Sequence, residues 1–188
     1  MGSGDLVPVL ETKRLLLRGH QTSDFPDSAA MWADEQVVAH ISGTPSTPEQ
    51  SWSRLLRYTG HWCHLGYGYW AVLSKEDGAF LGEVGFADYH RQSEPSLEGA
   101  PEAGWVFAAF AHGRGFATEA VTAMLVWADA NLNHSHTCAM FDPSYSASIN
   151  LAKKVGYANE VMGRYESQPT LFMQRVRRTL RNDREHQA

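Results

Sequence analysis

The chain has 188 residues, of which 16 are Lys or Arg and 21 are Asp or Glu, so its formal net charge is −5. This length predicts one domain, and a hydrophobic content of 43% excludes a disordered chain. The negative charge disfavours a nucleic-acid binder that relies on bulk positive charge. The longest uncharged apolar stretch, Ala103 to Ala111, is shorter than the roughly 20 residues of a membrane span. We therefore expect neither nucleic acid nor a membrane as a partner.

The cysteine content and the first residues favour a cytoplasmic protein. Cys63 and Cys138 are too few for a disulfide framework. The start, Met1-Gly2-Ser3-Gly4, lacks the basic and apolar regions of a signal peptide. Both features point to a reducing compartment. The expected organisation is a flexible leader at 1–9, a single domain at 10–180 and a frayed tail at 181–188.

The N-terminal part predicts one strand and two helices. Residues 12–18 carry three leucines between basic residues and form the expected strand. Ser23 can cap a helix that runs to about Val38. Thr47-Pro48-Glu49-Gln50 supplies a capping box with proline at the first helical position, which predicts a helix through about His64. The apolar side of that helix is expected to hold Trp52, Leu55, Leu56 and Trp62.

The remainder predicts six strands and two helices. The strands are expected at 67–73, 80–88, 102–109, 136–141, 160–166 and 170–177. The helices are expected at 115–131 and 146–155, and a loop at 90–100. This order predicts an α/β (α+β) fold with a mixed, mostly antiparallel seven-stranded sheet and about four flanking helices. Within it, the strand–helix–strand unit at 102–141 should be parallel.

The segment Glu102–Ala120, EAGWVFAAFAHGRGFATEA, carries the clearest chemical signal. A buried strand leads through a glycine-bearing loop into a helix, whose first amides lack backbone acceptors and carry the positive end of the macrodipole. Gly113 and Gly115 let a ligand approach the backbone closely, and Arg114 adds a positive charge. The segment therefore predicts a seat for an anion such as a pyrophosphate.

Other interpretations of this loop are weaker or less specific. Two glycines before a helix are also compatible with ordinary turn and packing chemistry. The loop lacks the Gly-Lys-Ser or Gly-Lys-Thr ending of a nucleoside-triphosphate loop. It also lacks the third glycine of a dinucleotide fingerprint.

With its later segments, the chain resembles the GNAT superfamily of N-acetyltransferases. The motifs that carry the resemblance are Gly-x-Gly-x-Ala before the long helix, Asp142-Pro143, Ser146-Ala147-Ser148-Ile149 and Lys154-Val155-Gly156-Tyr157. The opening Thr-Lys-Arg-Leu-Leu-Leu-Arg at 12–18 is similar to the branch that includes the bacterial ribosomal-protein N-terminal acetyltransferases. The resemblance extends over about Leu10 to Arg177.

The resemblance implies acetyl-coenzyme A as the cosubstrate. Its pyrophosphate would lie on the loop amides, and its pantetheine arm would pair with a strand that splays from Cys138–Phe141. The expected coenzyme contacts are Val106, Phe107, Ala108, His112, Gly113, Arg114, Gly115, Phe116, Ala117, Thr118 and Ser148. Two positions depart from the family pattern, since His112 stands where Gln or Arg is usual and Tyr145 where Asn is usual.

Acetyl transfer to an amine calls for a general base. Glu83 is the expected base, because its carboxylate lies on an otherwise apolar strand, where desolvation would raise its pKa. A salt-bridged or edge glutamate fits the same pattern. Glu102, Asp88 and His90 are the rival candidates.

The other catalytic groups follow from the reaction. A backbone N–H near Val106 is the expected oxyanion donor. Ser148 is expected to hydrogen-bond the leaving sulfur, although a local backbone bond also suits a serine in the first turn of a helix. His134, His136 and Cys138 alternate along a strand, but alternation alone produces such triples, so no metal is expected.

The acceptor is the least defined partner. Trp32, Trp70 and Tyr89 are expected to line its pocket, although each aromatic also suits a core. The leading hypothesis is direct transfer of acetyl to a primary amine, on a small molecule or a protein N-terminus, by a monomer or homodimer. The alternatives are a non-catalytic coenzyme A or acyl-coenzyme A sensing domain and a nucleotide- or phosphosugar-binding enzyme that uses the same anion seat.

Overall fold

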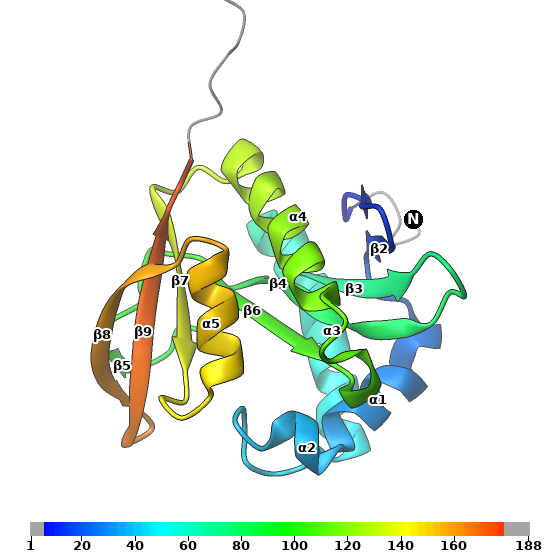
Figure 1. Cartoon of the computed structure of the whole chain (residues 1–188), viewed down its shortest axis with the longest axis horizontal. Helices are drawn as coiled ribbons and strands as arrows, with labels where there is room; N and C mark the ends of the chain where they lie inside the picture. Colours follow the sequence, from blue (N-terminus) through cyan, green and yellow to red (C-terminus); the bar gives the residue numbers. More distant parts are fainter. Residues whose placement is uncertain (1–5, 179–188) are drawn as a thin grey trace, which may run out of the picture.

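A nine-stranded sheet forms the centre of the computed structural model, which describes residues 6–178 (Figure 1). The strands are β1 Leu10–Glu11, β2 Leu15–Arg18, β3 Tyr69–Ser74, β4 Phe80–Ala87, β5 Ser93–Glu94, β6 Glu102–Phe107, β7 His136–Phe141, β8 Ala158–Tyr165 and β9 Gln168–Val176. Their order in the sheet is β1-β2-β3-β4-β6-β7-β9-β8-β5, and only β6 and β7 pair in parallel. The mixed, mostly antiparallel sheet is as predicted, with nine strands rather than seven.

The helices lie on both faces of this sheet. They are α1 Phe25–Ala33, α2 Glu35–Val38, α3 Pro48–Leu65, α4 Phe116–Asn131 and α5 Ser146–Lys154, with short 3-10 turns at Thr22–Asp24 and Ala109–Ala111. In Figure 1, α4 and α5 lie in front of the strands, and α3 lies behind them. None of the helices in residues 6–178 has the length and apolar character needed to cross a membrane.

The first predicted helix is in fact two helices. Asp34 ends α1 in an extended conformation, with φ −79° and ψ 117°. Its side chain then accepts a hydrogen bond from the Gln36 amide at 2.8 Å, which caps α2. The prediction of one continuous helix to Val38 missed this break, because Asp34 was not identified as an N-cap.

Helix α3 begins where the capping box predicts. The Gln50 amide donates to Thr47 Oγ1 at 3.2 Å, and the Thr47 amide donates to Gln50 Oε1 at 2.8 Å. Its predicted apolar side is wrong in part, since Trp52 is 37% exposed and Leu56 is 50% exposed. The buried face instead holds Ser51, Leu55, Tyr58, His61 and Trp62.

Two residues of the expected leader at 1–9 pack against the domain. Val7 is 6% exposed within the main core cluster. The Pro8 carbonyl accepts a hydrogen bond from Trp70 Nε1 at 2.7 Å. Residues 1–5 and the expected frayed tail at 181–188 lie outside the described residues.

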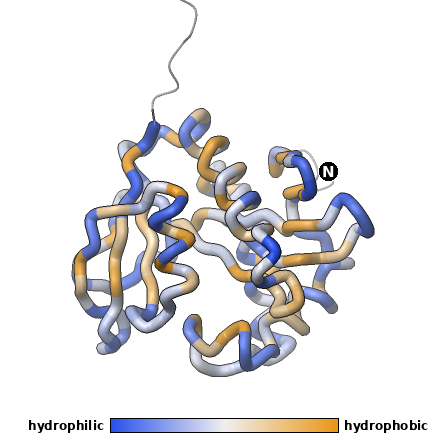
Figure 2. Tube along the Cα trace, viewed as in Figure 1, coloured by the Kyte–Doolittle hydropathy of each residue, from blue (hydrophilic) through white to orange (hydrophobic). Residues whose placement is uncertain are grey.

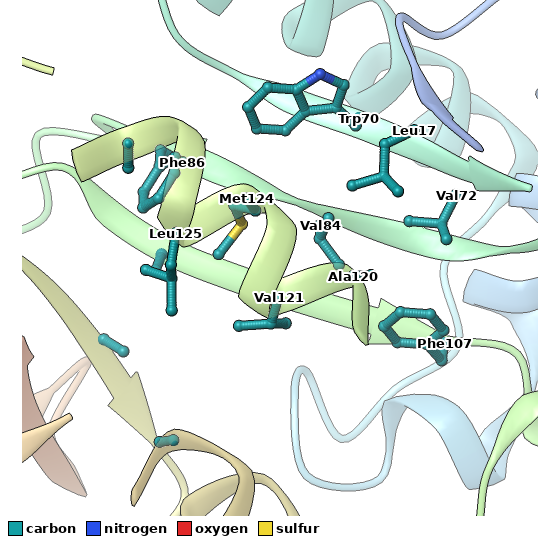
Figure 3. Close-up of a cluster of buried hydrophobic side chains, with 14 of the residues drawn as sticks. Leu17, Trp70, Val72, Val84, Phe86, Phe107, Ala120, Val121, Met124 and Leu125 are labelled. Carbon is teal, nitrogen blue, oxygen red and sulfur yellow. The ribbon is translucent and has the colours of Figure 1, made fainter. Parts of the chain in front are cut away.

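The main core lies between α4 and the sheet. Figure 3 shows Ala120, Val121, Met124 and Leu125 of α4 directed toward apolar side chains of the central strands. The tube in Figure 2 is correspondingly apolar along much of the central strands and polar along many of the connections. A second cluster on the other face joins Met31, Trp32, Val37, Val38, Ala71, Phe80, Val106 and Ala108. Consecutive residues of β6 therefore contribute to two different cores.

Strands β6 and β7 are held together only at one end. Their single paired position is Glu102 with Cys138, where the Cys138 amide donates to the Pro101 carbonyl at 3.0 Å. Beyond it the strands diverge (Figure 1). This is the splay that the family resemblance implies.

Met124 tests the main core, because its side chain is fully buried between α4 and the sheet. Met124→Ala should lower the free energy of unfolding by about 2–5 kcal/mol through lost apolar contact and the cavity it leaves. Val126→Ala is the matched control on the same helix, since Val126 is 57% exposed, and should cost about 0.5 kcal/mol or less. Urea unfolding of both variants measures the difference, and equal midpoints would contradict this packing.

Candidate active site

The loop between β6 and α4 presents a row of unpaired backbone amides. Gly113 and Gly115 adopt φ values of 71° and 78°, the left-handed region that glycine occupies without strain. The His112 amide still donates to the Ala109 carbonyl, and the Glu119 amide to the Gly115 carbonyl. Between them, the amides of residues 113–118 donate to no acceptor within residues 6–178. This is the exposed helix N-terminus that the sequence predicts.

Arg14 fastens this loop from β1–β2, a role that sequence reasoning missed. Its Nη1 donates to the Arg114 carbonyl at 2.9 Å, and its guanidinium lies 4.5 Å from the centre of the Phe116 ring. The guanidinium of Arg114 lies 4.8 Å from the centre of the same ring. Two guanidinium groups therefore lie beside the loop, that of Arg114 from the loop itself and that of Arg14, which is also ion-paired with Glu119 Oε2 at 2.7 Å. In the sequence, Thr12 and Arg14 indicated only the resemblance to a family branch, and nothing there predicted their contact with the loop.

Glu119, in the first turn of α4, anchors the same contact. It accepts hydrogen bonds from Thr12 Oγ1 at 2.6 Å, the Arg14 amide at 2.9 Å and Arg14 Nε at 2.7 Å. Burial alone would raise the pKa of this carboxyl, but the bonds from Thr12 and Arg14 lower it. An ionised Glu119 thus holds β2 and the loop in one arrangement.

His112 turns its ring back onto the strand. Its Nε2 lies 2.9 Å from the Phe107 carbonyl oxygen. Because a carbonyl can only accept, the ring donates this bond. His112 therefore closes the end of β6 in this structure.

The backbone N–H and C=O groups of the odd-numbered residues of β6 point toward β7. The Pro101 carbonyl accepts from β7, the Phe107 carbonyl accepts from His112, and the Ala108 amide donates to Leu81 on the β4 side. Since successive backbone groups of a strand point to opposite sides, the backbone groups of Trp105 and Phe107 face the opening between β6 and β7. The amide of Val106 points toward β4, so among the amides near it those of Trp105 and Phe107 face the opening.

Ser148 lies beside this opening, in the first turn of α5. Its Oγ accepts a hydrogen bond from Trp105 Nε1 at 2.8 Å. The indole packs 5.7 Å from the ring of Phe141 at the end of β7, so one side chain connects both diverging strands. Because Oγ accepts from the indole, its own proton is free to donate to a ligand.

Glu83 lies fully buried at the centre of a polar cluster below β4. Its oxygens accept from Ser28 Oγ at 2.7 Å, Trp32 Nε1 at 3.0 Å and Tyr58 OH at 2.9 Å. His20 Nε2 lies 3.4 Å from Oε1, within ion-pair range. Both oxygens of the carboxylate are therefore in contact with polar groups of the protein.

The pKa of Glu83 moves in the direction opposite to the prediction. Desolvation by burial would raise it, as expected, but His20, Ser28 and Trp32 outweigh burial and lower it. A lowered pKa and three hydrogen-bond donors make this carboxylate a poor proton acceptor for an incoming amine. The structure shows Glu83 as a buried tether that joins α1 and α3 to β4.

The predicted acceptor aromatics lie in three different places. Trp32 donates a hydrogen bond from Nε1 to Glu83. The guanidinium of Arg54 lies 3.7 Å from the centre of the Trp32 ring. Trp70 is fully buried against Trp62 and Trp127, so it is a core residue and cannot line a pocket. Tyr89 lines a cavity of about 330 Å³ in the β4–β6 connection.

The rival bases gather around that cavity. Asp88, His90 and Glu102 all contribute to its wall. Glu102 is ion-paired with Arg91 Nε at 2.8 Å, and burial, the largest effect, raises its pKa above the ordinary value. The cavity lies at the paired end of β6 and β7, away from the opening between them.

Replacing Glu83 tests the tether. Glu83→Gln places an amide NH2 among the donors Ser28, Trp32 and Tyr58 and should lower the free energy of unfolding near neutral pH by about 1–3 kcal/mol, the cost of an unsatisfied buried polar group. Because the folded-state pKa is lowered, the carboxylate stabilises the fold above its ordinary pKa and loses this effect as the pH falls through the folded value. The difference from the wild type should therefore shrink in acid.

Urea unfolding across a pH series measures this difference. Glu76→Gln, on an exposed turn, is the control and should leave the unfolding midpoint almost unchanged. A Glu83→Gln difference that grew toward low pH would show that the assigned sign is wrong.

Comparison with known proteins identifies the family. The model of the acetyltransferase (GNAT) domain matches residues 14–158. The uncharacterised protein YkkB of Bacillus subtilis (strain 168) is 32% identical over 156 residues, which cover 78% of this chain and 83% of YkkB.

Solved structures agree with this match. A GNAT-family acetyltransferase from Bordetella pertussis, described as putative, superposes with a TM-score of 0.78 at 28% identity, covering 90% of this chain and 99% of that one. The ribosomal-protein-S5-alanine acetyltransferase from Vibrio fischeri shares the fold with a TM-score of 0.71 at 18% identity, covering 90% and 97%. The chain therefore belongs to the GNAT family of acetyl-coenzyme A-dependent N-acetyltransferases.

Proposed function

We propose that the chain transfers the acetyl group of acetyl-coenzyme A directly to a primary amine within a ternary complex. The observation that carries this proposal is a continuous run of unpaired backbone groups, which we call the backbone track. The unpaired edge of β6 leads, through the turn at Ala109–Ala111, to the free amides of residues 113–118. A pantetheine arm can add to a strand edge as a further strand would, and a diphosphate suits the N-terminus of a helix.

The residues of the track fit the coenzyme. We propose that the pyrophosphate lies on the amides from Gly113 to Thr118, between the guanidinium groups of Arg14 and Arg114. A Cβ added at Gly113 would meet nothing within 4 Å, so this side of the loop is open. Among the strand residues, Trp105 and Phe107 face the arm, whereas the backbone amides of Val106 and Ala108 pair toward β4.

The cysteines support direct transfer. Burial, the main cause, raises the pKa of the Cys138 thiol to about 12, so the thiol is not ionised at neutral pH. Cys63 is exposed on α3, on a different element from the track. An acetyl-enzyme intermediate would need an activated nucleophile, and neither cysteine has the surroundings of one.

The acceptor is proposed as an amine on a small molecule or a protein N-terminus. The similar Vibrio fischeri structure is described as acting on an alanine of a ribosomal protein, so N-terminal peptides belong among the amines to be tested. Polyamines and aminoglycosides represent the small-molecule class.

A thiol-release screen tests the activity. Acetyl-coenzyme A is incubated with the protein and each amine, and free thiol is measured while calorimetry follows coenzyme A binding. Amine-dependent release supports the transferase. Binding without release for every amine would favour a coenzyme A sensing domain.

Thermal stabilisation by ligands distinguishes the transferase from the alternative of a nucleotide-binding enzyme. A ligand at 100 times its Kd adds about 2.7 kcal/mol to stability. Coenzyme A should raise the melting temperature, and ATP or NAD should not. The reverse result would move the anion seat to another ligand class.

Gly115 tests the anion seat. Gly115→Asp places a negative charge at the helix N-terminus and should raise the Kd for coenzyme A by tenfold or more, about 1.4 kcal/mol. Gly115→Asn is the matched control, because asparagine has the same shape, no charge and a tolerance for the left-handed conformation. Calorimetry should show a smaller effect for asparagine than for aspartate. Equal affinities of aspartate variant and wild type would remove the loop from the site.

Ser148 tests the leaving-group side. Ser148→Ala should lower kcat by about tenfold or more, since a hydrogen bond to a charged group contributes about 1.5–3 kcal/mol. Steady-state kinetics measures it, with Ser146→Ala, an exposed serine of the same turn, as the control. Trp105→Phe removes the indole donor that orients Ser148 and should give an intermediate kcat. An unchanged kcat in Ser148→Ala would place the sulfur elsewhere.

A further inference from the structure

A cluster of four residues connects the α2–α3 connection to the start of α5. The ring of His40 stacks on the ring of Tyr145, with centroids 4.6 Å apart and planes at 12°. His40 Nδ1 lies 3.3 Å from Asp142 Oδ2 and 3.4 Å from Ser144 Oγ. These contacts join residues more than 100 positions apart in the sequence.

This cluster lies where β6 and β7 have diverged. His40 follows α2, whose Val37 and Val38 belong to the same buried cluster as Val106 and Ala108. On the other side, Asp142 directly follows the last residue of β7. Figure 1 shows α2 and the β7–α5 connection approaching each other beyond the ends of these strands. The imidazole therefore lies at the open side of the site.

The carboxylate of Asp142 fixes the orientation of the ring. Its Oδ1 accepts from the Ser144 amide at 2.8 Å and from Ser144 Oγ at 2.7 Å. These bonds from Ser144, followed by the one from His40, hold the pKa of Asp142 below its ordinary value. An ionised carboxylate only accepts, so Nδ1 of His40 donates and Nε2 carries a lone pair.

Nε2 of His40 is available to a ligand. It has no hydrogen-bond partner in the described part of the chain, and the side chain is 41% exposed. The titratable and polar groups that face the ring are Asp142, Ser144 and Tyr145. Asp142 supplies the negative charge beside the ring, which also favours a cationic ligand such as an ammonium group.

We infer that His40, oriented by Asp142 and by its stack on Tyr145, is the general base that deprotonates the acceptor amine. The inference rests on the proposed function. Nε2 takes one proton from the ammonium group, and the amine nitrogen attacks the acetyl carbonyl carbon. The carbon–sulfur bond then breaks, the second amine proton goes to the thiolate, and the imidazolium returns its proton to water.

Other candidate bases are less well placed. Glu83 is surrounded by donors, and Glu102 is ion-paired four residues from Val106, about 13 Å along the strand. Among the other histidines, His20 is buried beside Glu83, and His112 is bound to a carbonyl. His136 begins β7 at the end opposite to Asp142.

The experiment compares pH profiles of kcat/KM for the amine that gives the fastest thiol release in the screen above. The wild type should lose activity toward low pH as the base is protonated. His40→Asn keeps a donor toward Asp142 but has no basic nitrogen, so its kcat/KM should fall about 100-fold or more. Because only the free amine can then react, the midpoint of the acidic limb should move up to the pKa of the acceptor amine. His64→Asn, on the exposed end of α3, is the matched control and should behave as the wild type does.

Asp142→Asn tests the positioning role. The neutral amide keeps a hydrogen-bond acceptor for His40 but no longer stabilises the imidazolium, so the acidic limb should move to lower pH. A merely structural contact would change the rate without moving the limb. The coenzyme A Kd of each variant, measured by calorimetry, should match that of the wild type, and His40→Gln repeats the profile if His40→Asn does not bind coenzyme.

The outcomes separate this inference from the proposed function. A His40→Asn enzyme whose acidic limb keeps the wild-type midpoint, whatever its rate, overturns the role of His40 and leaves the transferase intact. Coenzyme binding by the wild type without thiol release for any amine overturns the transferase, and the base with it. An upward displacement of the limb in His40→Asn and a downward displacement in Asp142→Asn support the inference.

Discussion

The site depends on a single paired position between two parallel strands. Where β6 and β7 meet at Glu102 and Cys138, the sheet is continuous, and beyond that position both strands carry unpaired backbone groups on their facing edges. Unpaired strand edges are normally covered or blunted, because they attract other chains. Here the exposed edge leads directly to the loop amides before α4. One interruption of the ladder thus supplies both a slot and the direction along which a long ligand can lie.

Around this slot, several carboxylates hold elements of the fold in position through hydrogen bonds and ion pairs. Glu83 and Glu119 are both carboxylates whose pKa values are lowered by the donors around them, and each connects elements distant in sequence. Glu83 holds two helices under β4, and Glu119 holds the start of the chain against the loop. Asp142, also with a lowered pKa, does the same for an imidazole. Fully hydrogen-bonded carboxylates of this kind rigidify the structure around them.

Much of the fold and the free amides before α4 could be predicted from the sequence, because both depend on local patterns. Apolar periodicity located the long strands and α4, and the glycine-bearing turn before α4 revealed the free amides. The strands of two residues, β1 and β5, are too short to show alternation. The break at Asp34 needed the recognition of one cap, and the buried face of α3 contains Ser51 and His61, which no hydrophobic pattern includes.

The candidate catalytic groups were harder to predict for a physical reason. Desolvation on an apolar strand was expected to raise the pKa of Glu83, but the partners that lower it come from residues 20, 28, 32 and 58 and cannot be inferred from its own strand. The pair of His40 and Asp142 likewise joins two loops that no periodicity connects.

The contacts of Thr12 and Arg14 with Glu119 also bear on how the protein folds. They span 107 and 105 positions of the sequence, so distant segments must meet before the loop ahead of α4 has its final shape, and such non-local contacts form slowly. A ligand that recognised only the finished loop would draw the population toward the fully assembled molecule.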